Sequence, residues 1–134
     1  MEAGMLTQEP KIEAEKMSGA ALRSFFGMAK AWQLSAEEQM GLLGLGNRRS
    51  TLFHWKKHGG VLSVDTLERI SYLLGIYKAL RILLVSEEAA HEWVKKPNKA
   101  PLFGGKSALS RMLKGMGDLF LVRQYLDAQR GGSV

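Results

Sequence analysis

The 134-residue chain contains no cysteine and has no long, uninterrupted hydrophobic run. Without cysteine it cannot form a disulfide framework, a thiolate zinc site or a thiol nucleophile. The longest apolar stretch, residues 70–85, is interrupted by Lys78 and Arg81 and is shorter than the roughly 20 residues that cross a bilayer. No basic segment followed by an apolar run opens the chain, so we expect no signal peptide, no membrane association and a cytoplasmic location.

Acidic residues are missing from one part of the chain. The 19 lysines and arginines exceed the 13 acids and give a net charge of +6, which favours an acidic partner. Residues 39–64 contain no acid but hold Arg48, Arg49, Lys56 and Lys57. A second excess of positive charge follows Arg81. We interpret the two basic regions as two separate surfaces.

No segment shows the alternating pattern of a strand, whereas apolar residues recur at helical spacing through most of the chain. The prediction is an all-α fold, a small helical bundle in four parts. The parts are a flexible, polar N-terminal arm over residues 1–17 that contains Pro10, a helix-turn-helix region over 18–62, a long central helix over 63–85 and a helical C-terminal region over 86–134. Ser35 with Glu38 forms a capping-box pattern, and Ser63 or Asp65, Ser86 and Ser107 are placed to begin further helices.

Two short helices joined by the turn Gly44-Leu45-Gly46-Asn47 indicate a helix-turn-helix, whose second helix enters the DNA major groove. Arginines there can pair with guanine, small polar side chains can reach base edges or phosphates, and lysines can contact phosphates. Phe53 can touch a thymine methyl group. The predicted DNA-binding residues are Asn47, Arg48, Arg49, Ser50, Thr51, Phe53, His54, Lys56 and Lys57. The alternative is a solvated basic helix in a small bundle.

The C-terminal half carries a more specific pattern. The segment from Ala89 to Asn98 ends in Trp-x-x-x-Pro-Asn, and the segment from Leu102 to Leu109 contains Gly-Gly before a short Leu-rich helix. Together they resemble the toxin-binding domain of the Xre/MbcA/ParS antitoxin family, and residues 51–56 and 65–70 resemble its Xre-like helix-turn-helix portion and connecting helix. The resemblance covers residues 20–131, although the family often has proline where Ala108 stands.

The resemblance implies an antitoxin that binds and silences a RES-domain toxin, which consumes NAD or transfers its ADP-ribose to a target. It also implies occlusion of the toxin's NAD site by the C-terminal region, and repression of the operon through operator DNA. We expect a homodimer within a larger toxin–antitoxin assembly. The expected toxin-binding residues are Trp93, Pro97, Asn98, Gly104, Gly105, Lys106, Arg123, Tyr125, Leu126, Arg130 and Gly131.

These residues also have ordinary explanations. Leucine and valine at helical spacing belong to a core more often than to an interface, scattered lysines are usually solvated, and Trp93 is expected to be partly buried. The glycines give the loop unusual dihedral angles, the arginines suit an acidic rim, and Tyr125 and Leu126 suit apolar anchoring.

No catalytic pattern is present. His54, His58 and His91 are too scattered to suggest a ligand cluster, and the glycine clusters follow no strand. We therefore expect a non-enzyme without a metal or cofactor. The alternative functions are a stand-alone helix-turn-helix regulator whose C-terminal half dimerises it, and a structural adaptor that has lost DNA binding.

Overall fold

A computed structural model describes the backbone of residues 2–131 and the side chains of residues 9–131, and these residues form helices and loops without a strand. The helices are α1 (Glu2–Ala31), α2 (Ala36–Leu43), α3 (Arg49–His58), α4 (Val64–Leu83), α5 (Glu87–Glu92), the 3₁₀ helix η1 (Trp93–Lys95), α6 (Ala108–Met112) and α7 (Met116–Gly131). The predicted all-α class is confirmed. No helix within residues 2–131 is both long and apolar enough to cross a membrane.

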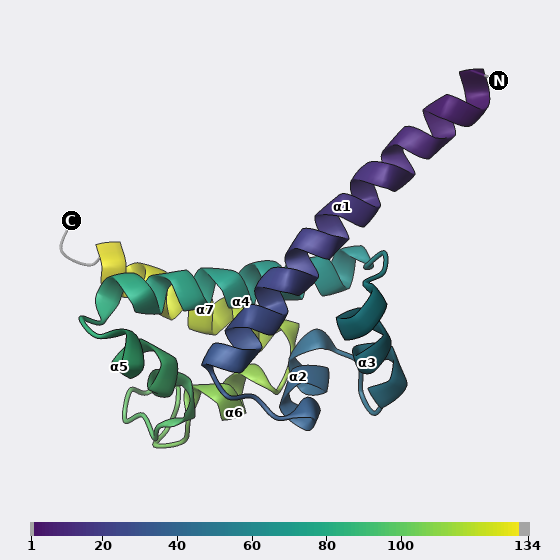
Figure 1. The fold of residues 1–134 in the computed structure, drawn as a ribbon. Coiled ribbons are helices and arrows are strands. Elements are labelled where there is room, and N and C mark those ends of the chain that lie inside the picture. The colour runs from purple at the N-terminus through teal and green to yellow at the C-terminus, as the bar shows by residue number, and fades with distance from the viewer. Residues whose placement is uncertain (1, 132–134) are drawn as a thin grey trace.

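Helix α4 is the centre of the fold. It packs along α7 and against α1, and it also contacts α2 and α5 (Figure 1). Its apolar residues point in more than one direction, so one helix can support neighbours on several sides. Ile70, Leu73, Ile76 and Leu80 are buried among side chains from α1, α2 and α7.

Serine caps begin four of the helices. Ser35 forms the predicted capping box with Glu38, and the Ser63, Ser86 and Ser107 hydroxyls accept backbone N–H bonds at the starts of α4, α5 and α6. Each hydroxyl satisfies a backbone donor that has no partner within its own helix. These predictions are confirmed.

The sequence analysis expected a flexible N-terminal arm over residues 1–17 and did not predict a helix there. Residues 2–17 continue the helix of α1, which projects past the rest of the chain with Pro10 inside it (Figure 1). Lysine, glutamate and alanine favour helix, and a polar sequence without periodicity indicates exposure rather than an irregular backbone. Burial begins at Ser18, whose hydroxyl accepts a hydrogen bond from the backbone of Leu62 at 2.9 Å. Residue 1 lies outside the described part.

Candidate functional site

Helices α2 and α3 are held at an angle by a glycine turn and a small apolar core. Gly44 ends α2 with φ 73°, and Gly46 follows with φ 62°, both in the left-handed region that favours glycine. Leu43 and Leu45 are buried together with Leu52 of α3. The turn that the sequence predicted is therefore present, and buried leucines pack the two helices together.

Helix α3 turns one face toward the core and leaves the opposite face free. Leu52 is buried and Trp55 is half-buried against the core. Ser50, Phe53 and Lys57 lie on the opposite side, since they are separated from Leu52 by large rotations around the helix. Of the predicted DNA-binding residues only Thr51 is half-buried; Asn47, Arg48, Arg49, Ser50, Phe53, His54, Lys56 and Lys57 are exposed.

The two predicted arginines, Arg48 and Arg49, both make contacts within the protein. Nε of Arg48 donates to the Leu45 carbonyl at 3.1 Å, and Arg49 forms an ion pair with Glu37 of α2. A hydrogen bond from its own backbone and then the Arg49 guanidinium lower the pKa of Glu37 below 4.5. Glu37 was missed as a site residue, although its place in an acidic first turn just ahead of the basic helix was a signal. This ion pair places the Arg49 guanidinium beside α2 at the start of α3.

The segment from Pro97 to Ser107 is an ordered loop. An antiparallel bridge joins its two ends, and Asn98 organises its interior. The Asn98 N–H donates to the Lys106 carbonyl at 3.0 Å, its carbonyl accepts from Gly105 at 2.8 Å, and its side-chain oxygen accepts from Ala100 at 2.9 Å. The predicted residues Pro97, Asn98, Gly104, Gly105 and Lys106 are brought together in this loop, which we name the Pro97–Ser107 loop.

The two glycines allow the loop to close. Gly104 has φ 58° and Gly105 has φ 86°, and both are exposed with open space where a Cβ would be. An L-residue in this conformation is strained by its own backbone. The glycines are therefore required by the turn, and they leave the backbone uncovered at the surface.

A chain of aromatic rings fastens the loop to the helices. Phe103, only 5% exposed, meets Trp93 edge-on at 5.7 Å between ring centroids and Tyr125 of α7 at 5.4 Å. Trp93 and Tyr125 are half-buried by these contacts. The sequence analysis did not assign Phe103, whose place in the middle of a loop rich in glycine and proline was the available signal.

The remaining predicted residues lie elsewhere on α7. The Arg123 side chain lies over α4 at Gly75. It donates a hydrogen bond to the Ser71 carbonyl at 3.4 Å and forms an ion pair with Asp127 at 3.6 Å. Its side chain thus fastens α7 to α4. Arg130 and Gly131 are exposed and line a groove of about 590 Å³ with Arg123 and Ile82.

Leu126 is not at the surface. It is 2% exposed and belongs to the core with Val122 and Leu119, so α7 uses these residues to pack on α4. The expectation that Leu126 anchors a partner does not match this burial, because leucines at helical spacing satisfy the core first. Arg111 pairs with Asp118 of α7 at 2.7 Å.

Comparisons with known proteins match both halves of the chain. Residues 13–75 match the antitoxin Xre-like helix-turn-helix domain, and residues 79–132 match the antitoxin Xre/MbcA/ParS C-terminal toxin-binding domain. A curated protein of Sinorhizobium fredii (strain NBRC 101917 / NGR234), named uncharacterized protein y4oB, is 54% identical over 114 residues, which cover 84% of this chain and 86% of that protein. The chain therefore belongs to the Xre/MbcA/ParS family of toxin–antitoxin antitoxins.

Proposed function

We propose that this antitoxin neutralises a RES-domain toxin by covering the toxin's NAD site with its C-terminal region, and that α3 binds operator DNA. The observation that carries the proposal is the Pro97–Ser107 loop, which lies inside the segment that matches the toxin-binding domain and presents an ordered, exposed backbone. The protein acts as a steric block and performs no chemistry itself.

The order of the loop favours tight binding. A loop already fixed by an internal bridge and by Phe103 loses little conformational entropy when a partner covers it. Lys106 is exposed on this loop and supplies positive charge for an acidic rim. Trp93 and Tyr125 hold the loop in place and offer their half-exposed edges to the partner.

The end of α7 forms the second part of the proposed toxin contact. Arg130 and Gly131 are exposed, and Arg130 is held near Asp127 at 4.0 Å. Residues 123, 127 and 130 share a side of α7 that differs from that of Tyr125, since residues 123 and 125 are about 200° apart around the helix. A toxin that touches both parts must therefore reach around α7.

The DNA-binding part of the proposal rests on α3. Its exposed face carries Ser50, Phe53 and Lys57, no acid occurs between residues 39 and 64, and the charge of Glu37 beside α3 is offset by its ion pair with Arg49. Lys56 and Lys57 contact phosphates, while Arg49, oriented by Glu37, reaches a base edge. A homodimer would place two such helices on two half-sites, which is the usual arrangement for this motif.

Co-expression with the adjacent toxin gene tests the toxin-binding half. We expect the toxin alone to deplete cellular NAD and stop growth, and the intact chain to restore both and to co-purify with the toxin. A truncation that tests the contact of the α7 end must keep the core residues Val122 and Leu126, which removal of the last 15 residues would delete. Removal of residues 128–134 retains them and should weaken neutralisation while the chain stays folded.

A matched pair of variants separates the two surfaces. Lys106→Glu with Arg130→Glu should weaken toxin binding and leave operator binding intact, whereas Lys56→Ala with Lys57→Ala should do the opposite. All four side chains are exposed, so folding should be unaffected. Full neutralisation of the toxin by the variant with Lys106→Glu and Arg130→Glu would contradict the proposed contact surface.

A stand-alone regulator is the second candidate. Phe120 and Leu121 are exposed on α7 and could join two copies through the C-terminal half. In that case the adjacent gene product would be harmless or indifferent to this chain, and Phe120→Ser would reduce self-association and operator binding together.

A further inference from the structure

Two histidines stand side by side on α3. His54 and His58 are one helical turn apart, and their ring centroids are 5.1 Å apart with the planes at 44°. Both residues are exposed, and within the described side chains neither ring makes a hydrogen bond or ion pair. The sequence analysis treated the three histidines as scattered, but the i, i+4 spacing of these two places them on one face of the helix.

The separation of the rings matches that of two imidazoles bound to one ion. A metal–nitrogen distance is about 2.0 Å, and the ring centroid lies about 1.2 Å beyond the nitrogen. Two rings that share an ion at a tetrahedral angle then have centroids about 5.2 Å apart. The observed 5.1 Å is close to this value. Copper and nickel prefer ligands at right angles, which corresponds to centroids about 4.5 Å apart, and a small rotation of the two exposed side chains reaches that separation.

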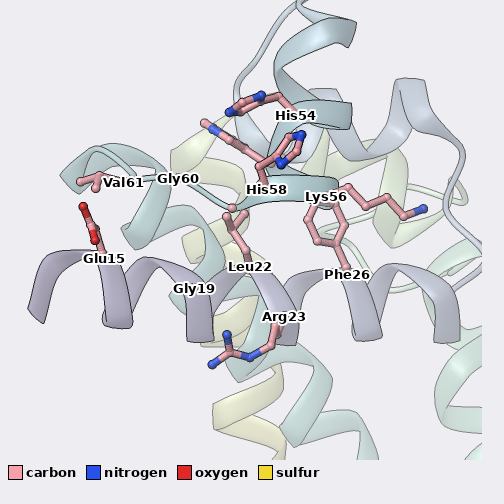
Figure 2. Close-up of a pocket in the computed structure, with 12 residues that line it drawn as sticks. Glu15, Gly19, Leu22, Arg23, Phe26, His54, Lys56, His58, Gly60 and Val61 are labelled. Carbon is pink, nitrogen blue, oxygen red and sulfur yellow. The ribbon is translucent and has the colours of Figure 1, made fainter. Parts of the chain in front are cut away.

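The surroundings leave room for an ion and its water ligands. The histidines stand at one wall of a groove of about 560 Å³ between α1 and α3 (Figure 2). Arg23 and Lys56 also line it, but their charged ends extend away from the two rings in Figure 2. The charge repulsion that these cations exert on a bound ion is therefore reduced by distance and by solvent.

The number and type of donors point to a class of ion. No group of three or more histidine, aspartate or glutamate side chains within the described residues could hold a metal, so an ion at this pair would take two nitrogens from the protein and its other ligands from water. Imidazole suits copper, nickel and zinc, whereas magnesium and calcium require oxygen ligands.

We propose that His54 and His58 form a two-histidine site for a divalent transition-metal ion, with Cu²⁺ held more tightly than Ni²⁺ or Zn²⁺. The bound ion bridges successive turns of α3 and adds positive charge to that helix. The site is independent of toxin binding, and it does not require that α3 binds DNA.

Titration calorimetry on the full chain without an affinity tag tests the proposal, with NiCl₂ and separately CuCl₂ at pH 7.5. We expect one ion per chain and tighter binding of copper. Because each ligand is half of the protein's contribution, His54→Gln and His58→Gln should each weaken binding by at least about tenfold. His91→Gln, on α5, should leave the affinity unchanged.

A variant with altered spacing controls for the mere number of histidines. Lys56→His combined with His58→Gln keeps two histidines on α3 but turns them to different sides, so it should not restore binding. Copper should also broaden the NMR signals of His54 and His58 before those of His91. The absence of saturable binding would overturn the proposal, as would equal affinity in the wild type and both glutamine variants with their folds intact.

Discussion

At the scale of single residues, Phe103 joins the Pro97–Ser107 loop to the helices. It touches Trp93 on one side and Tyr125 on the other, and it is the buried aromatic residue within that loop. Ala100 and Leu102 of the loop also pack against the core, but they are only half-buried. Phe103 is therefore the most buried apolar link between the proposed toxin contact and the helices, beside the bridge and the Asn98 hydrogen bonds that order the loop itself.

Phe103→Ala should lower the free energy of unfolding by about 3–5 kcal/mol, the usual cost of removing a buried phenylalanine. Phe53→Ala is the matched control, since Phe53 is 50% exposed on α3, and it should change stability by about 0.5 kcal/mol or less. Urea denaturation followed by circular dichroism measures both. Equal losses in the two variants would contradict the anchoring role of Phe103.

Glu37 provides a prediction for acid pH. Its pKa lies below 4.5 in the folded chain, first because of its own backbone hydrogen bond and then because of Arg49. A lowered folded pKa means that the carboxylate stabilises the fold above pH 4.5 and loses this contribution as the pH falls through the folded value. In an NMR titration, Arg49→Gln should raise the pKa of Glu37 but leave it below 4.5, because the backbone hydrogen bond remains. An unchanged pKa in the variant would show that the ion pair does not form in solution.

At the scale of elements, short helices depend on their ends. Helix α2 has only eight residues, and an isolated helix of that length is unstable in water. Its capping box and its buried leucines therefore decide whether it forms. The same holds for α6, which has five residues and begins at the Ser107 cap.

Ser35→Ala should destabilise the protein by about 1 kcal/mol, because the Glu38 N–H loses its acceptor and the capping box is lost. Ser24→Ala, at an exposed position inside α1, is the control and should be neutral or slightly stabilising, since alanine favours helix. Thermal unfolding of the two variants side by side gives the comparison. A cost as large for Ser24→Ala as for Ser35→Ala would argue against a specific capping effect.

At the scale of the whole molecule, α1 has two parts with different roles. From Ser18 onward it contributes Leu22, Phe25 and Met28 to the core, whereas residues 9–13 are exposed and the helix before them runs away from the other elements (Figure 1). The match to the helix-turn-helix domain also begins at residue 13.

Deletion of residues 1–12 should therefore leave the melting temperature of the folded chain nearly unchanged. Leu22→Ala removes a side chain that is 2% exposed and should cost about 2–5 kcal/mol. Differential scanning calorimetry separates the two results. A large loss of stability in the deletion variant would mean that the projecting part of α1 packs against something, such as a second copy of the chain.

Local signals in the sequence determined most of the elements. Serine caps, the glycine turn after α2 and the apolar periodicity of α4 act within a few residues, so the all-α class and the helix-turn-helix could be predicted. These local signals did not indicate that residues 2–17 are helical. A polar stretch without an apolar face can still form a helix, provided that the helix is exposed to solvent.

The tertiary structure alone decided which side chains are available to a partner. Leu126 and Tyr125 are neighbours in the sequence, yet one is in the core and the other is half-exposed beside Phe103. Arg49 and Glu37 are brought together by the angle between α2 and α3. Burial and long-range pairing depend on how helices pack, and packing is a property of the whole chain that no local pattern contains.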